Sequence, residues 1–246
     1  MKKAMSAAIA AALVLLMIAL GVVALSLGRI VKSAVETAGP RLLGAPVTLG
    51  SVSISPLSGR GTLRGLVIGN PPGFKSPHAV RVGSAEVVLK LSSLLSDTVV
   101  VESLIVRDPE LIWEIGPDGS NLTKLSRNAE TAADKFGGGK KSASPEGGAQ
   151  RKGKSLLIRD FSVAGGKVGL SATTLGGQGL SAPLPAVHLT NLGGPGRSPA
   201  EVAAEAFGAI TRAAQGAASN AGGKAIDAAR GAALKALDSF LKRNGK

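Results

Sequence analysis

The chain has 246 residues, no cysteine, a formal net charge of +13 and a pI near 10.4. The lack of cysteine excludes disulfides, thiolate nucleophiles and zinc–thiolate sites. Strong positive charge is typical of proteins that meet anionic lipid or nucleic acid, although scattered Lys and Arg also keep a protein soluble. Nucleic acid is not expected, because five Phe, one Trp and no Tyr offer few stacking platforms for bases.

The first feature along the chain is Ala4–Leu27, a run of 24 uncharged and almost wholly apolar residues. At about 1.5 Å per residue, a helix of this length spans roughly 36 Å, enough to cross a hydrocarbon core about 30 Å thick. The run predicts a transmembrane signal-anchor over residues 1–28. The alternatives are a buried core helix and a cleaved secretory signal, for which Ala24-Leu25-Ser26 offers a weak cleavage site.

Orientation is less clearly encoded than insertion. Lys2 and Lys3 precede the run, and Arg29, Lys32 and Arg41 follow it, so charge alone does not decide. A short basic tail before a long apolar run is typical of signal-anchors that export everything after them. We therefore expect a single-pass protein of the inner (cytoplasmic) membrane, with its body in the periplasm.

Residues 29–135 are expected to form a β-rich module. A short helix over 33–38 is predicted to stop at Gly39-Pro40, and Leu91 to Ser96 reads as a turn or single helical turn. The alternation of apolar residues slips at Gly50-Ser51 and again at Gly83-Ser84, which indicates bulges or turns. The spacing favours an antiparallel meander. The expected strands cover 47–54, 61–68, 80–89, 98–106 and 111–115.

A helix is predicted from Leu122 to about Asp134, followed over 136–154 by a Gly-, Ser- and Lys-rich segment typical of a disordered basic linker. Residues 155–195 return to β structure, with a hairpin expected at Gly165-Gly166. In the same segment, Pro183 and Pro185 suggest an edge strand.

Residues 196–246 are expected to be helical. Ser198, Pro199 and Glu201 make a strong helix start, because they provide a cap, a proline at the first position and an acid at the third. The Gly- and Ala-rich stretch 215–223 is predicted to weaken or break the helix. A last amphipathic helix then packs on the β body, lies on a membrane surface or covers an open sheet face.

Catalytic signals are nearly absent from the sequence. His78 and His188 have no carboxylate or serine at motif spacing, and each is expected on the surface or on a strand. We therefore expect no enzymatic activity, no cofactor and no metal site. Trp113 is expected in the core or in a groove.

The order of motifs from the apolar run to Leu125 resembles the amino-terminal module of the AsmA-like family of envelope proteins. No single motif is diagnostic, but the ordered set is moderately specific. The set comprises Leu43-Gly44-Ala45-Pro46-Val47, Gly61-Thr62-Leu63-Arg64-Gly65-Leu66, Gly69-Asn70-Pro71-Pro72-Gly73-Phe74, Val82 to Leu95, Val101 to Leu111 with its Pro109-Glu110-Leu111, and Gly119-Ser120-Asn121-Leu122 with Leu125.

The resemblance implies an inner-membrane anchor, a periplasmic β-rich body, no enzymatic activity, and a role in outer-membrane integrity or lipid traffic. We expect an α+β fold: an amino-terminal transmembrane helix, an antiparallel β-rich body forming a curved sheet or groove, and carboxy-terminal helices. Membrane phospholipid is the expected partner, with an envelope protein as a possible second. The residues expected to contact lipid are Val80, Val82, Val87, Leu89, Val99, Val101, Leu111, Trp113 and Ile115.

Two hypotheses follow from this organisation. In the first, an uncovered apolar sheet face holds the acyl chains of a phospholipid. In the second, the final helices cover that face, and the chain is a membrane-tethered structural adaptor that docks a protein partner without binding lipid. A sheet with one apolar face must cover it with a helix, another sheet or an apolar ligand, so the position of the helices separates the two.

Overall fold

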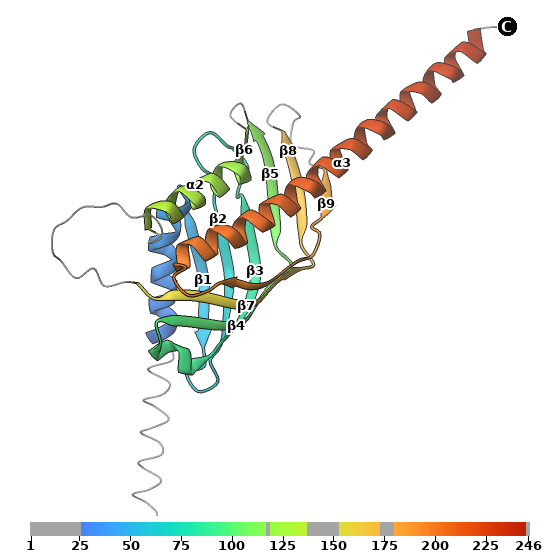
Figure 1. The fold of residues 1–246 in the computed structure, drawn as a ribbon. Coiled ribbons are helices and arrows are strands. Elements are labelled where there is room, and N and C mark those ends of the chain that lie inside the picture. Colours follow the sequence, from blue (N-terminus) through green and yellow to red (C-terminus); the bar gives the residue numbers. More distant parts are fainter. Residues whose placement is uncertain (1–25, 117–118, 137–152, 173–179, 245–246) are drawn as a thin grey trace, which may run out of the picture.

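The computed structural model describes residues 26–116, 119–136, 153–172 and 180–244. These form an α+β fold with one open, mixed ten-stranded sheet and three α-helices (Figure 1). The predicted anchor over 1–28 and the predicted linker over 136–154 lie almost wholly outside the described residues. Within those described ranges, no helix is both long and apolar enough to span a bilayer.

The described elements follow one another in an order close to the expected one. A helix over residues 26–43 precedes the first strand. The other helices are η1 (Leu91–Leu95), α2 (Asn121–Phe136) and α3 (Pro199–Asn244). The strands are β1 (Val47–Ile54), β2 (Arg60–Ile68), β3 (Val80–Leu89), β4 (Thr98–Arg107), β5 (Glu110–Gly116), β6 (Gly119–Ser120), β7 (Ser155–Ala164), β8 (Lys167–Ala172), β9 (Ser181–Pro183) and β10 (Val187–Gly193).

The sheet is mixed, so the expectation of a purely antiparallel body is wrong. Strands β1 to β4 do form an antiparallel meander, but β4 pairs in parallel with β7 and β5 pairs in parallel with β8. The chain between them includes α2 and is long enough for the crossover that parallel pairing requires. Residues 155–195 therefore complete the same sheet as the amino-terminal strands.

The hairpin expected at Gly165-Gly166 is also wrong. Strands β7 and β8 do not pair with each other; they form one bent strand that pairs in parallel with β4 and β5. The difference in residue number between paired residues is constant from Thr98–Ser155 to Ile115–Ala172. The β9 and β10 strands form a similar bent edge, paired with β8 and β7 respectively. The edge position suggested by Pro183 and Pro185 is confirmed.

The bends fall on one line across the sheet, which we call the crease. The positions on this line lie at the gaps in the pairing registers, and three of them have a positive φ: 66° at Gly65, 49° at Asp108 and 74° at Gly165. Following the registers from strand to strand, the crease comprises Gly50, Gly65, Gly83, Asp108, Gly165 and Pro185.

The crease keeps the apolar side chains on one face of the bent sheet. In β3, Val80 and Val82 are buried before it, and the inward positions become Ala85, Val87 and Leu89 after it. Two consecutive residues thus point outward at the crease, which confirms the phase slip predicted at Gly83-Ser84. The same change in β1, at Gly50-Ser51, confirms the other predicted slip.

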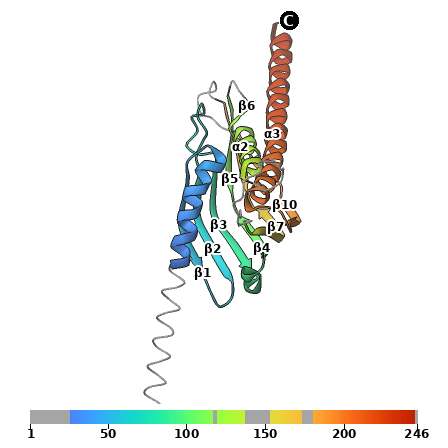
Figure 2. The ribbon, with the colours of Figure 1, turned by 60° about the vertical axis from the view of Figure 1, so that its left-hand side comes forward.

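Helices α2 and α3 lie across the inner face of the sheet (Figures 1 and 2). Leu122 and Leu125 of α2 and Val202 and Ala214 of α3 are fully buried in the core. The predicted start of α3 is confirmed, because the Ser198 N–H donates to Glu201 Oε2 at 2.7 Å and the Glu201 N–H donates to Ser198 Oγ at 3.2 Å.

The predicted break over 215–223 is wrong, because α3 continues without interruption from Pro199 to Asn244. Each glycine costs only about 1 kcal/mol relative to alanine, and the alanines around them are the best helix formers. The helix therefore runs past the sheet, and its later part extends away from the body (Figure 1).

The helix over 26–43 lies along the outer edge of β1. The Leu49 N–H donates to Glu36 Oε1 at 2.9 Å, while Lys32 Nζ donates to the carbonyls of Leu49 and Gly50. The predicted stop at Gly39-Pro40 is wrong: a Cβ on Gly39 would lie 2.9 Å from Val47 Cβ, so this glycine permits close packing rather than ending the helix. The edge strand is thereby protected from further pairing.

We predict that Gly165→Ala destabilises the fold much more than Gly83→Ala, although both glycines lie on the crease. A Cβ at Gly165 would meet Asp108 Oδ1 at 2.1 Å, whereas one at Gly83 would meet nothing within 4 Å. The positive φ alone costs an alanine about 1–2 kcal/mol. Denaturant unfolding of the two variants compares the losses directly, and equal losses would contradict the crease as a conformational requirement.

Candidate functional site

The inner face of the sheet is divided into a covered part and a partly exposed part. On the side of the crease that holds β5, β8 and the start of β1, Leu49 and Leu111 are each 1% exposed and Val168 is fully buried. On the other side of the crease, five apolar residues of β1, β2 and β3 remain partly exposed, and we call them the open patch. The open patch comprises Val52, Ile54, Leu63, Val87 and Leu89.

The pairing registers place the open patch on one surface. Val52 lies opposite Leu63 in the β1–β2 pairing. Gly61 stands between Ile54 and Val87, since its absent Cβ would lie 2.8 Å from Val87 Cγ1 and 3.6 Å from Ile54 Cγ1. Val87 therefore packs directly over Gly61, and the absence of a side chain there lets Ile54 and Val87 approach each other across β2.

The structure places the nine expected lipid-contact residues in three different settings. Five of them form part of the covered core: Val80, Val82, Val101, Leu111 and Trp113. Val87 and Leu89 belong to the open patch. Val99 is partly buried in β4, and Ile115, near the end of β5, is 55% exposed. Lipid contact stays a prediction for Val87 and Leu89, the two members of the set that lie on the open patch.

Val52, Ile54 and Leu63 were not among the residues predicted to contact lipid. All three alternate with polar residues, so their strands were predicted, but which alternate residues face inward beyond each slip was left open. The signal that assigns them is the alignment of the slips: Gly50, Gly65 and Gly83 lie on one line only when the three strands are paired. This alignment is visible in the register rather than in any single strand.

Ion pairs lie on the outer face of β3, β4 and β7. Arg107 Nε donates to Glu86 Oε1 at 3.0 Å, and Arg159 Nη1 donates to Glu102 Oε2 at 3.1 Å, both at the surface. The hydrogen bond from Arg107, together with its charge, lowers the pKa of Glu86. The contrast between the two faces indicates that the open patch is the apolar side of the sheet rather than a general surface feature.

A buried polar network joins two of the sequence motifs. Asn121, fully buried at the start of α2, donates through Nδ2 to Asn70 Oδ1 at 2.8 Å and to the Ile112 carbonyl at 2.9 Å. Its Oδ1 accepts from the Glu114 and Leu122 N–H groups. The Asn121 side chain thereby joins the Asn70 loop to β5 and to the start of α2.

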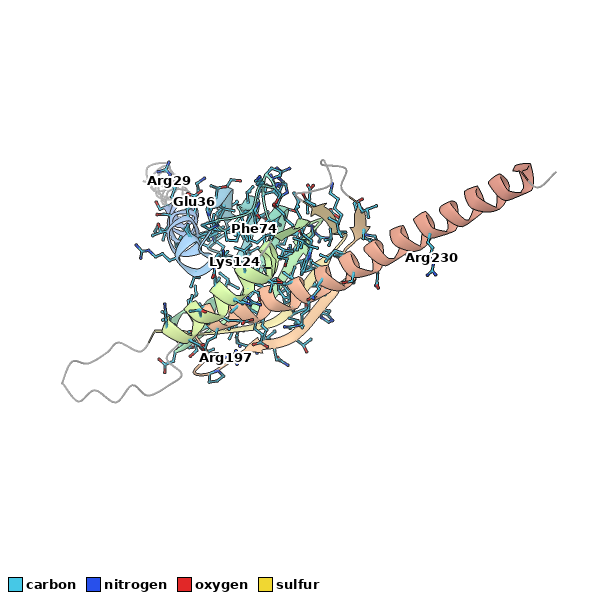
Figure 3. All side chains as sticks on the ribbon, turned by 90° about the horizontal axis from the view of Figure 1, so that it is seen from above. Arg29, Glu36, Phe74, Lys124, Arg197 and Arg230 are labelled. Atoms are coloured by element: carbon cyan, nitrogen blue, oxygen red, sulfur yellow. The ribbon has the colours of Figure 1, made fainter. Side chains whose placement is uncertain are left out.

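The loop after Asn70 is held by a carboxylate and a cation. Glu114, 2% exposed, accepts hydrogen bonds from the backbone N–H groups of Lys75 and Ser76. Lys124 Nζ donates to the Pro72 carbonyl at 3.2 Å and lies 5.9 Å from the centre of the Phe74 ring (Figure 3). Glu114 thus holds the loop to β5, and Lys124 holds it to α2.

The expectation that His78 lies on the surface or on a strand is wrong, because this residue is 3% exposed and stands in the loop before β3. Its burial lowers the pKa of the imidazole, with the Arg81 charge acting in the same direction. His188, by contrast, lies exposed on β10, as expected for a strand residue, with Nε2 3.1 Å from Asp160 Oδ2.

A polar cleft of about 510 Å³ lies between α2 and α3. Arg197 pairs there with Glu205 at 2.9 Å and with Glu201 at 3.8 Å. Hydrogen bonds from the Ser198 backbone lower the pKa of Glu201, whose carboxylate caps the helix. Among the described residues, no group of three or more His, Asp or Glu side chains is arranged to hold a metal ion.

No family model, curated protein or solved structure matches the chain. The resemblance to the AsmA-like family therefore stays a prediction.

We predict that Asn121→Ala destabilises the fold by several kcal/mol. The change leaves buried partners unsatisfied, at about 1–3 kcal/mol for each orphaned group. Asn220→Ala, at an exposed position of α3, is the matched control and should stay within about 0.5 kcal/mol of the parent. Urea unfolding followed by circular dichroism measures both, and a near-neutral Asn121→Ala would contradict the role of the network.

Proposed function

We propose that the chain is a non-enzymatic, single-pass protein of the inner membrane, of AsmA-like type, with its body in the periplasm. In this proposal the open patch holds an acyl chain of a membrane phospholipid. The function served is phospholipid handling or maintenance of the outer membrane and envelope. The observation that carries the proposal is the partly exposed apolar part of a sheet face that the helices cover elsewhere.

The position of the open patch supports a lipid as its occupant. Val52 and Ile54 end β1, and Leu89 ends β3, so the patch reaches the end of the molecule at which the helix over 26–43 begins (Figures 1 and 2). The apolar run Ala4–Leu27 directly precedes that helix in the sequence. A chain anchored by this run brings the patch close to the bilayer, which is the source of acyl chains.

The chemistry of the patch also favours an acyl chain. Its side chains are aliphatic, and burying apolar surface contributes about 25 cal/mol for each Å² removed from water. Val87 packs over Gly61, which makes the patch continuous, and such aliphatic surfaces offer no hydrogen bonds that would select a polar ligand. The pairing of Arg107 with Glu86 lies on the opposite face and takes no part.

A second candidate function is the structural adaptor, and the length of α3 favours it. The helix covers the inner face up to Ala218 and then extends away from the body, where Arg230 is exposed (Figures 1 and 3). The sequence of this extension is amphipathic by pattern. Its apolar positions are Ile226, Ala229, Ala233, Leu234, Leu237, Phe240 and Leu241. A protein partner docking along this helix would not require any lipid on the sheet.

The test is native mass spectrometry of the detergent-extracted full chain, looking for bound phospholipid. We predict that the parent carries phospholipid and that Val87→Asp loses it, because a carboxylate on an apolar surface is costly to desolvate. Val88→Asp is the matched control, since Val88 is similarly buried but points to the opposite face of β3. It should retain the lipid.

The two functions give different results in this experiment. A parent without phospholipid, or a folded Val87→Asp variant with unchanged occupancy, would contradict the open patch as a lipid site and favour the adaptor. Circular dichroism and protease resistance establish that each variant is folded. If Val87→Asp does not fold, Val87→Thr provides the same comparison, because its hydroxyl weakens apolar contact with little change in volume.

A further inference from the structure

Four leucines are exposed at one end of the molecule, where the chain enters the body. This entry end comprises the start of the helix over 26–43, the β1–β2 turn and η1, which lie together in both views (Figures 1 and 2). Leu57, in the turn, is 76% exposed, and Leu95, at the end of η1, is 94% exposed. Leu91 and Leu94 of η1 are 36% and 40% exposed.

Contacts tie these segments into one surface. The Leu89 N–H donates to the Gly59 carbonyl at 2.8 Å, and a Cβ on Gly59 would lie 3.2 Å from Leu91 Cγ. On the other side, a Cβ on Gly28 would lie 2.5 Å from the Val52 carbonyl oxygen. The leucines of the turn and of η1 are therefore held close to the start of the first helix by packed backbone.

Basic side chains surround the exposed leucines. Arg29, Arg60 and Lys90 are exposed in or next to these segments, and Lys154, which precedes β7, donates to the Leu94 carbonyl. Asp97 is an exposed acidic residue close to η1. The entry end combines exposed leucines with a surplus of cations, which makes it complementary to an anionic lipid surface. The leucines can enter the interface, and the cations can bind the headgroups.

We propose that the entry end docks on an anionic bilayer, with Leu57 and Leu95 inserted at the interface. The surplus of positive charge favours a membrane surface here, and so does the chain itself, because the apolar run Ala4–Leu27 enters the body at this end. The inference rests on the membrane anchoring in the proposed function, but not on lipid binding at the open patch. Docking holds the body against the membrane with the open patch facing its source of lipid.

The chain has no cysteine, so single-cysteine labelling of the full protein is unambiguous. The full chain is reconstituted in nanodiscs of phosphatidylcholine, with or without phosphatidylglycerol, that contain a lipid-borne fluorescence quencher. A fluorophore is placed at Leu57→Cys or Leu95→Cys. Ile115→Cys, an apolar position outside the entry end that is 55% exposed, is the control.

We expect the probes at positions 57 and 95 to lose fluorescence in the presence of the quencher, while the probe at 115 does not. The loss should increase with phosphatidylglycerol and decrease with added salt, because the cations contribute. Equal quenching at all three positions, or none at 57 and 95, overturns the docking even if the chain remains in the nanodisc. A chain that does not enter nanodiscs overturns the anchoring itself, whereas phospholipid occupancy in native mass spectrometry tests the open patch separately.

Discussion

The crease is the constraint on which the rest of the structure depends. A strand alternates its side chains between two faces, so strict alternation through the bend would turn every later apolar side chain to the outside. At the crease each strand instead turns two consecutive residues outward. Because the change occurs on one line, marked by Gly65, Asp108 and Gly165 in the left-handed region, a single apolar face continues around the bend.

The bent sheet then determines what the helices cover. Helices α2 and α3 pack against the part of the inner face that carries Leu111, Trp113 and Val168, and this becomes the core. Five apolar residues of β1 to β3 on the other side of the crease are left partly exposed. The same geometry brings the ends of these strands beside the start of the helix over 26–43, so the open patch and the exposed leucines of the entry end are neighbours.

The sequence predicted local structure well where the signal was local. The strands, both phase slips, the capping box at Ser198 and the edge position of Pro183 follow from patterns within a few residues. Pairing between distant segments was not predictable in this way: residues 155–172 read as a hairpin because Gly165-Gly166 is a common turn sequence, and Asp108 gave no sign that it would be its neighbour. The glycines of α3 suggested a break, which helix cooperativity overrides. Of the site, Val87 and Leu89 were predicted, but Val52, Ile54 and Leu63 required the register.

The account depends most on the open patch being the surface that meets lipid. A photoreactive amino acid introduced at Val87, Glu86 or Val82 tests this within one strand in the membrane of living cells. Val87 faces the open patch, Glu86 the polar outer face and Val82 the covered core. The account predicts phospholipid adducts at position 87 and not at 86 or 82. Adducts at 86 as abundant as those at 87, or none at 87, would contradict it.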